Sequence, residues 1–190
     1  AGGQSRQVRE VATLAGHSNW VNSVAFSPDG NWALTGSLDD TAKLWRLEGS
    51  SAGGEARQVR EVATLAGHSS SVRSVAFSPD GNWALTGSSD DTAKLWRLEG
   101  SRAGGQSRQV REVATLAGHS NWVNSVAFSP DGNWALTGSL DDTAKLWRLE
   151  GSSAGGEARQ VREVATLAGH SSSVRSVAFS PDGNWALTGS

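Results

Sequence analysis

Four histidines recur along the chain, and histidine is the side chain best suited to acid–base and metal chemistry near neutral pH. They are His17, His68, His119 and His170. Four imidazoles from four equivalent segments could surround a metal ion. A histidine beside a hydroxyl and an aspartate could instead serve a hydrolase. An enzyme, however, should break the repetition at one unique site, and the sequence contains no such break.

The composition excludes several other chemistries. The 190 residues carry a formal net charge of −2 and include no Cys, no Met and nine Trp. Without cysteine there is no disulfide framework, no thiolate nucleophile and no cysteine-based zinc site. The near-neutral balance argues against a broadly basic nucleic-acid surface. We therefore expect no nucleic-acid partner, and the sequence identifies no small-molecule substrate.

The uncharged stretch of residues 11–28 contains a histidine, asparagines and serines, so we expect no membrane span. The sequence shows neither an initiator Met nor a signal peptide. These features predict a soluble chain that was processed or trimmed, as in a recombinant product. The lack of Cys is compatible with expression in the cytoplasm.

The segment VATLAGHS begins at Val11, Val62, Val113 and Val164, with a constant step of 51 residues. A fixed period of this size indicates a solenoid, a propeller or an array. The repeats span 1–51, 52–102, 103–153 and 154–190, and the last one lacks its final 14 positions.

The four repeats alternate between two types, A and B, in the order A-B-A-B. Type A carries Trp20 and Leu38, which recur as Trp122 and Leu140, whereas type B carries Arg73, which recurs as Arg175. Outside a few such positions the copies are nearly identical. So little divergence favours an engineered sequence over a recent natural amplification.

Each complete repeat contains four stretches with the composition of β-strands. In the first copy they are 7–14, 21–26, 32–37 and 41–47, rich in Val, Thr, Leu and Trp. Ser27-Pro28-Asp29-Gly30-Asn31 forms a turn because Pro presets φ and Gly accepts a positive φ. Residues 48–56 are rich in Gly, Ser and Ala, which predicts a plain linker.

A four-stranded antiparallel sheet has two faces and cannot bury both by itself. Several such sheets that pack face to face around an axis bury them, and each large apolar side chain contributes about 1.5–3 kcal/mol. The chain is therefore predicted to be all-β, with one sheet, or blade, for each repeat.

These residues resemble the WD40 repeat, whose pattern they match in order and spacing. The matching motifs are Gly16-His17, Val24–Gly30, Leu34–Ser37 and Asp39–Trp45, and they recur in the later copies. One departure is Arg46, where the family usually has Asp. The near-identity of the copies further resembles engineered symmetric WD40 propellers.

The resemblance implies a structural tetrad of hydrogen bonds in each blade, from Trp through Thr and His to Asp. A satisfied polar chain of this kind stiffens a blade, and it leaves no histidine for a metal site or a catalytic triad. The sets are Trp45, Thr35, His17 and Asp39; Trp96, Thr86, His68 and Asp90; Trp147, Thr137, His119 and Asp141; and, in the fourth repeat, His170 and Thr188.

The family usually closes its ring with seven or eight blades, and copies of a four-repeat chain give multiples of four. Each chain begins with type A and ends with type B, so joining two chains repeats the junction between repeats two and three. We therefore expect a homodimer that forms one eight-bladed ring with C₂ symmetry. Because WD40 rings close through an N-terminal outer strand, here 7–14, we also expect the chain to be incomplete after Ser190.

Three functions are weighed: an engineered self-assembling scaffold without natural activity, a protein- or peptide-binding adaptor, and an enzyme. We expect the scaffold, with the adaptor as the alternative, because almost every surface feature recurs with the repeat. The positions that differ between types A and B cluster, by resemblance, on the top face. Trp20 there is expected to pack against Leu38 between blades; the alternative is an exposed binding patch that comprises Trp20, Leu38, Arg73, Trp122, Leu140 and Arg175.

Overall fold

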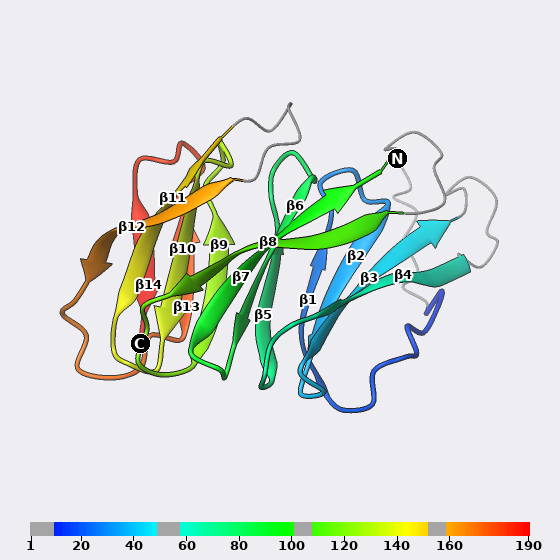
Figure 1. Ribbon diagram of the computed structural model, residues 1–190, viewed down its shortest axis with the longest axis horizontal. Coiled ribbons are helices and arrows are strands. Elements are labelled where there is room, and N and C mark those ends of the chain that lie inside the picture. The colour runs from blue at the N-terminus through cyan, green and yellow to red at the C-terminus, as the bar shows by residue number, and fades with distance from the viewer. Residues whose placement is uncertain (1–9, 49–57, 101–107, 152–158) are drawn as a thin grey trace, which may run out of the picture.

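The computed structural model describes residues 10–48, 58–100, 108–151 and 159–190. All regular secondary structure in these segments is β-strand (Figure 1). No helix in this part of the chain is long and apolar enough to cross a membrane. The predicted linker 48–56 lies outside the described residues, apart from Glu48.

The strands form three four-stranded antiparallel sheets and one two-stranded sheet. The first contains β1 (Val21–Phe26), β2 (Trp32–Ser37), β3 (Thr41–Glu48) and β4 (Gln58–Ala66). The second contains β5 (Val72–Phe77), β6 (Trp83–Ser88), β7 (Thr92–Glu99) and β8 (Gln109–Ala117). The third contains β9 (Val123–Phe128), β10 (Trp134–Ser139), β11 (Ala144–Glu150) and β12 (Gln160–Leu167). The last contains β13 (Ser176–Phe179) and β14 (Ala186–Gly189).

Sheet boundaries are offset from repeat boundaries. The fourth strand of the first sheet, β4, belongs to the second sequence repeat and pairs with β3 along its whole length. The expected strands 21–26, 32–37 and 41–47 are present, but residues 10–14 form no strand. Their counterparts in later repeats pair with a third strand that precedes them in the chain, and no described strand precedes residues 10–14.

Neighbouring sheets bury one another through two unlike faces. Strand alternation places Trp32, Leu34 and Leu44 on one face of the first sheet. They pack against Ala84 and Trp96 on the facing side of the second sheet in one continuous apolar cluster. The same arrangement recurs between the second and third sheets. Each blade therefore needs a neighbour on both sides, as expected from the sequence.

The first strands of successive sheets lie side by side, in the order β1, β5, β9 and β13 (Figure 1). The backbone N–H of Val75 donates to Ser23 Oγ across the first boundary, at 3.1 Å, and the same bond recurs at the next two. A Cβ on Gly87 would come within 2.9 Å of Val126, so glycine permits this close approach. The sheets thus form blades joined at their first strands.

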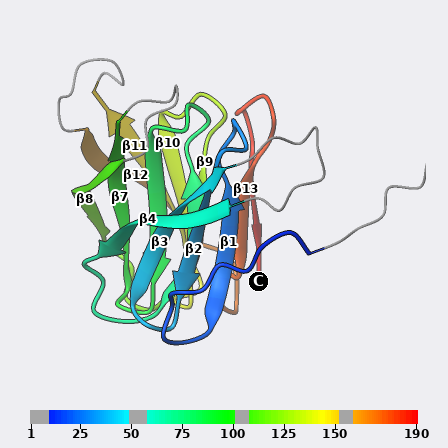
Figure 2. The same ribbon diagram turned by 90° about the vertical axis from the view of Figure 1, so that its right-hand side faces the viewer.

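The two ends of this row of blades are open, and Figure 2 looks onto the first of them. Val24 in β1 is 72% exposed, whereas its equivalent Val75 in β5 is 6% exposed. At the other end Leu187 is 73% exposed, whereas its equivalent Leu85 is fully buried. Equivalent residues of nearly identical strands therefore differ in burial when a neighbouring blade is absent, and Leu187 also lies in a sheet of two strands.

Candidate functional site

The polar chain inside each blade is best described in the second blade. Trp96 Nε1 donates to Thr86 Oγ1 at 2.9 Å. Thr86 Oγ1 lies 2.7 Å from His68 Nε2, and His68 Nδ1 lies 2.7 Å from Asp90 Oδ2. Strands β6 and β7 supply Thr86 and Trp96, the loop after β4 supplies His68, and the turn between β6 and β7 supplies Asp90. The four side chains therefore tie three parts of the blade together.

The hydrogen-bond directions are assigned from the Trp96 indole N–H, which can donate but cannot accept. The indole N–H donates to Thr86 Oγ1. Every remaining O–H and N–H of the polar chain has an acceptor when the threonine hydroxyl donates to His68 Nε2 and Nδ1–H donates to Asp90. This assignment makes the imidazole neutral. Burial lowers the pKa of His68 and outweighs the opposing effect of the hydrogen bond that His68 donates to Asp90. A neutral histidine thus satisfies every polar atom of the chain.

The aspartate of each polar chain is held ionised. Burial raises the pKa of Asp141, but hydrogen bonds from Thr143, His119 and Ser120 outweigh it and lower the pKa to about 2. The pKa of Asp90 is lowered in the same way, with Thr92 and His68 as the main donors. The carboxylate therefore accepts hydrogen bonds both from the turn that follows the second strand and from the imidazole.

The same contacts occur in the first and third blades. His17 lies 2.7 Å from Thr35 Oγ1 and 2.8 Å from Asp39, while Trp45 donates to Thr35 at 2.8 Å. The third blade repeats this geometry with Trp147, Thr137, His119 and Asp141. In the two-stranded sheet the structure contains the His170 Nε2 to Thr188 Oγ1 contact, at 2.8 Å.

This geometry does not favour either chemistry suggested by the histidines. Thr86 is fully buried and its oxygen is shared by an indole and an imidazole, so a substrate cannot reach it as a nucleophile. Among the described residues no group of three or more His, Asp or Glu side chains is arranged to hold a metal ion. Each histidine bonds within its own blade instead.

Sequence reasoning missed an ion pair that extends the polar chain outward. Lys94 Nζ donates to Glu112 Oε1 at 2.7 Å and to Thr115 at 3.0 Å. A Cβ on Gly67 would meet Glu112 at 2.9 Å and Trp96 at 3.3 Å, and the same crowding explains the glycines before His17 and His119. Lysine and glutamate lie 18 residues apart on paired strands, so the contact could have been found only from the strand register.

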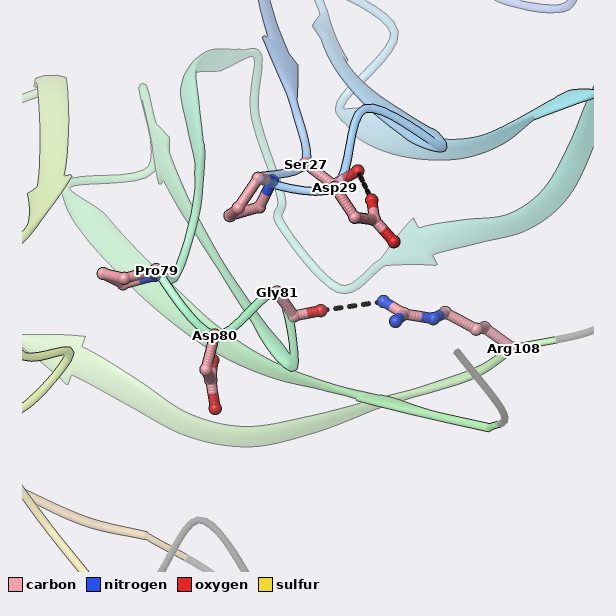
Figure 3. A pocket seen from close by; sticks show the side chains of 7 residues that line it. Ser27, Asp29, Pro79, Asp80, Gly81 and Arg108 are labelled. Carbon is pink, nitrogen blue, oxygen red and sulfur yellow. Dashed lines mark hydrogen bonds between the residues drawn. The ribbon is translucent and has the colours of Figure 1, made fainter. Parts of the chain in front are cut away.

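A small cavity of about 250 Å³ lies between the first two blades, near their first turns (Figure 3). Its lining includes Asp29, Asp80 and Arg108. Arg108 Nη1 donates to the carbonyl of Gly81 at 2.8 Å, and its guanidinium lies 4.8 Å from the Trp32 ring centroid. Arg108 comes from the residue before β8, so it ties the outer strand of the second blade to the first blade. The cavity is accordingly part of the contact between blades.

The residues expected on the top face do not form one continuous patch. In the single chain Trp20 is 79% exposed, so it is not packed between blades there as predicted, although Leu38 N donates to the Trp20 carbonyl at 2.9 Å. Its equivalent Trp122 is 40% exposed and lies 4.0 Å below the guanidinium of Arg73. Leu38 and Leu140 are half-buried, while Arg175 is exposed. The structure therefore pairs Arg73 with Trp122 and leaves Trp20 and Arg175 at opposite ends.

The most extensive exposed apolar surfaces of the described chain lie at its two ends. We call the first the leading face, which comprises the exposed Val24 and Phe26 and, beneath them, the buried Ala33 and Leu47 of the first blade. Residues 11, 12 and 14 also line this groove, and Leu14 packs against Ala33 and Leu47. We call the second the trailing face, which comprises the exposed Trp185 and Leu187. In the interior, equivalents of these two faces pack on each other.

Comparisons with known proteins identify similar sequences. The family model described as WD domain, G-beta repeat, matches residues 8–46, 59–97, 110–148 and 161–190. A ribosome biogenesis protein WDR12 homolog of Drosophila persimilis is 32% identical over 184 residues, which cover 92% of this chain and 40% of that protein. Nuclear distribution protein nudF of Aspergillus niger is 28% identical over 192 residues, covering 90% of this chain and 37% of that protein. The chain thus spans about two fifths of the length of these relatives.

Proposed function

The chain belongs to the WD40 repeat family, and on that premise we propose that it is a non-enzymatic binding platform whose first partner is a second copy of itself. The coarse architecture is that of WD40 β-propeller blades. The proposed working unit is one ring of eight blades formed by two chains. The polar chains within the blades are proposed to be structural.

The observation that carries the proposal is the complementarity of the two open faces. The trailing face offers Trp185 and Leu187, and the buried equivalents of these residues, Trp32 and Leu34, cover Ala84 and Trp96 of the next blade. The leading face offers the exposed Val24 and Phe26, whose equivalents Val75 and Phe77 pack in that same cluster, whereas Ala33 and Trp45 are already buried beside Leu14. A second copy placed as the next blade would therefore cover the exposed apolar side chains of both open faces as their equivalents are covered inside the chain.

The number of copies follows from closure. A contact between unlike faces propagates head to tail until the ring closes. Four blades in each chain allow rings of four, eight or twelve, and two chains give eight blades with C₂ symmetry. Each exposed valine or leucine that such a ring covers contributes about 1.5–3 kcal/mol.

A platform for other proteins is supported by the relatives, since they are natural WD40-repeat proteins rather than enzymes by name. This similarity favours the adaptor prediction over that of an engineered scaffold without a biological ligand. The engineered origin stays a prediction that depends on the near-identity of the repeats. The partner bound by such an adaptor is expected to contact the top face, where types A and B differ.

The test compares Leu187→Glu with the unmodified chain and with Gln109→Glu, which places the same charge on an exposed position of an interior blade. Light scattering should give the unmodified chain and Gln109→Glu about 40 kDa, twice the 19.8 kDa of one chain. It should give Leu187→Glu about 20 kDa, half that assembly, because a buried unpaired charge is costly. A monodisperse 19.8 kDa species for the unmodified chain would contradict the proposal.

A further inference from the structure

We infer that the alternation of repeat types specifies the junction between chains, and that Arg175 of one copy stacks on Trp20 of the other. This inference rests on the proposed ring and names the residue pair that selects its closure. It differs from the apolar contact of the open faces because it uses only the positions at which types A and B differ.

The chain contains two kinds of junction between blades. From type A to type B, the side chain of Asn22 donates to the Val72 carbonyl at 3.1 Å, and Asn124 donates to Val174 at 3.2 Å. From type B to type A, the contact is instead the stacking of Arg73 on Trp122, at 4.0 Å. The serine-to-valine bond is common to both kinds, so the asparagine and the arginine–tryptophan pair distinguish them.

The open ends hold the two halves of a second arginine–tryptophan pair. Trp20 precedes Trp122 by two full repeats, and Arg175 follows Arg73 by the same distance. Trp20 is 79% exposed against 40% for Trp122. Arg175 is exposed, whereas Arg73 is half-buried and donates from Nε to Ser89 Oγ. The ends of the chain therefore lack the pairing that the interior junction of the same type has.

When the type B end of each chain meets the type A start of the other chain, the C₂ ring restores this pairing at both junctions. The second copy would bring its Arg175 above Trp20, and its Ser176 beside the Val24 N–H, as Ser74 lies beside Val126 in the interior. Burial lowers the pKa of the Arg73 guanidinium, which indicates partial desolvation of the interior pair. Cation–π stacking is stronger when it is partly desolvated. The pair thus favours type A as the acceptor of a type B end.

The experiment uses two variants of the full chain, Trp20→Ser and Arg175→Asn. Each replacement is taken from the other repeat type, since Ser71 and Asn124 occupy these positions there. A homodimer of either variant has lost both pairs. A mixed dimer keeps one intact pair, formed by Arg175 of the first variant and Trp20 of the second. Native mass spectrometry resolves the three dimers because the variants differ in mass.

The expected result concerns the ratio of the mixed dimer to the geometric mean of the two homodimers. This ratio should exceed its value for random pairing by about five- to thirtyfold, which corresponds to ~1–2 kcal/mol for one cation–π pair. The matched control mixes Trp122→Ser with Arg73→Asn, which break the equivalent pair inside the chain and should pair at random. Random pairing of Trp20→Ser with Arg175→Asn, while the unmodified chain is a dimer, overturns this inference alone. A monomeric unmodified chain overturns the ring and the inference together.

Discussion

Val75 and Val24 occupy the same position in nearly identical strands, yet the first is 6% exposed and the second 72%. The strand pairing around them is the same in both blades. Burial in this molecule is therefore decided by the neighbouring blade rather than by the blade itself. A residue that is buried between two interior blades has an equivalent that is exposed in an end blade. A substitution at the end position therefore serves as the control for the same substitution inside the chain.

The largest difference is expected for an apolar core residue. Leu85→Ala should lower the free energy of unfolding by about 2–5 kcal/mol because it leaves a cavity between two blades. Leu187→Ala should change it by less than about 0.5 kcal/mol under conditions in which the chain is monomeric, since Leu187 is exposed. Urea unfolding measures both variants. Equal losses would show that the two positions are packed alike and would break the comparison.

A close approach between blades gives the next contrast. Gly87→Ala should lower the free energy of unfolding by about 1–3 kcal/mol, because its Cβ would meet two valines of the next blade at 2.9 Å. Gly189→Ala at the open end has no atom within 4 Å of its Cβ, so a small effect is expected. Thermal unfolding of the two variants makes the comparison. A stabilised Gly87→Ala protein would contradict the description of the blade contact.

The complete and partial polar chains should also differ. Thr86→Val leaves the indole of Trp96 and the imidazole of His68 without a shared partner, at a cost of about 1–3 kcal/mol. Thr188→Val removes one described contact, to His170, at the exposed end of the chain. Its effect should be smaller, at about 0.5–1.5 kcal/mol. Chemical unfolding at fixed protein concentration distinguishes these outcomes, and a neutral Thr86→Val would argue against a structural polar chain.

The smallest effect is expected from pH. Burial keeps the pKa values of His68 and His119 below the usual 6.5 despite their aspartate partners. A lowered folded-state pKa means that the unfolded chain binds protons first. Stability from this source should therefore be complete above pH 6.5 and be lost as the pH falls through the folded-state pKa values. Urea unfolding at a series of pH values between about 7.5 and 5 measures this contribution. A free energy of unfolding that rises on acidification would contradict the prediction.

The aspartates extend this decline to lower pH. The pKa of Asp141 is lowered to about 2, against an ordinary value of 3.8. Its contribution is present above pH 3.8 and disappears as the pH falls toward 2. Asp141→Asn should reduce the slope of stability against pH in this range, and an unchanged slope would show that another carboxylate causes it.

Much of this architecture could be predicted from the sequence because local pattern and turn chemistry determine it. The strands at 21–26 and 32–37 flank a Pro-Asp-Gly turn in which Gly30 has a φ of 68°. The strand expected at 7–14 is not formed over residues 10–14, since a strand requires a partner, and sequence alone does not supply one.

Contacts across strands were harder to predict. Lys94 and Glu112 meet only through the register of β7 and β8, and Arg108 reaches Gly81 and Trp32 across a blade boundary. The pairing of Arg73 with Trp122 likewise joins residues from two blades. Such contacts depend on strand register within a sheet or on how sheets are placed relative to each other, and neither propensity nor periodicity encodes these.

Sedimentation equilibrium of the unmodified chain over a range of concentrations tests the central claim most directly, because it reports whether the open faces find each other. The account predicts a single assembly of about 40 kDa, twice the 19.8 kDa chain, that does not grow at higher concentration. A stable 19.8 kDa species, or an open series of ever larger assemblies, would contradict it.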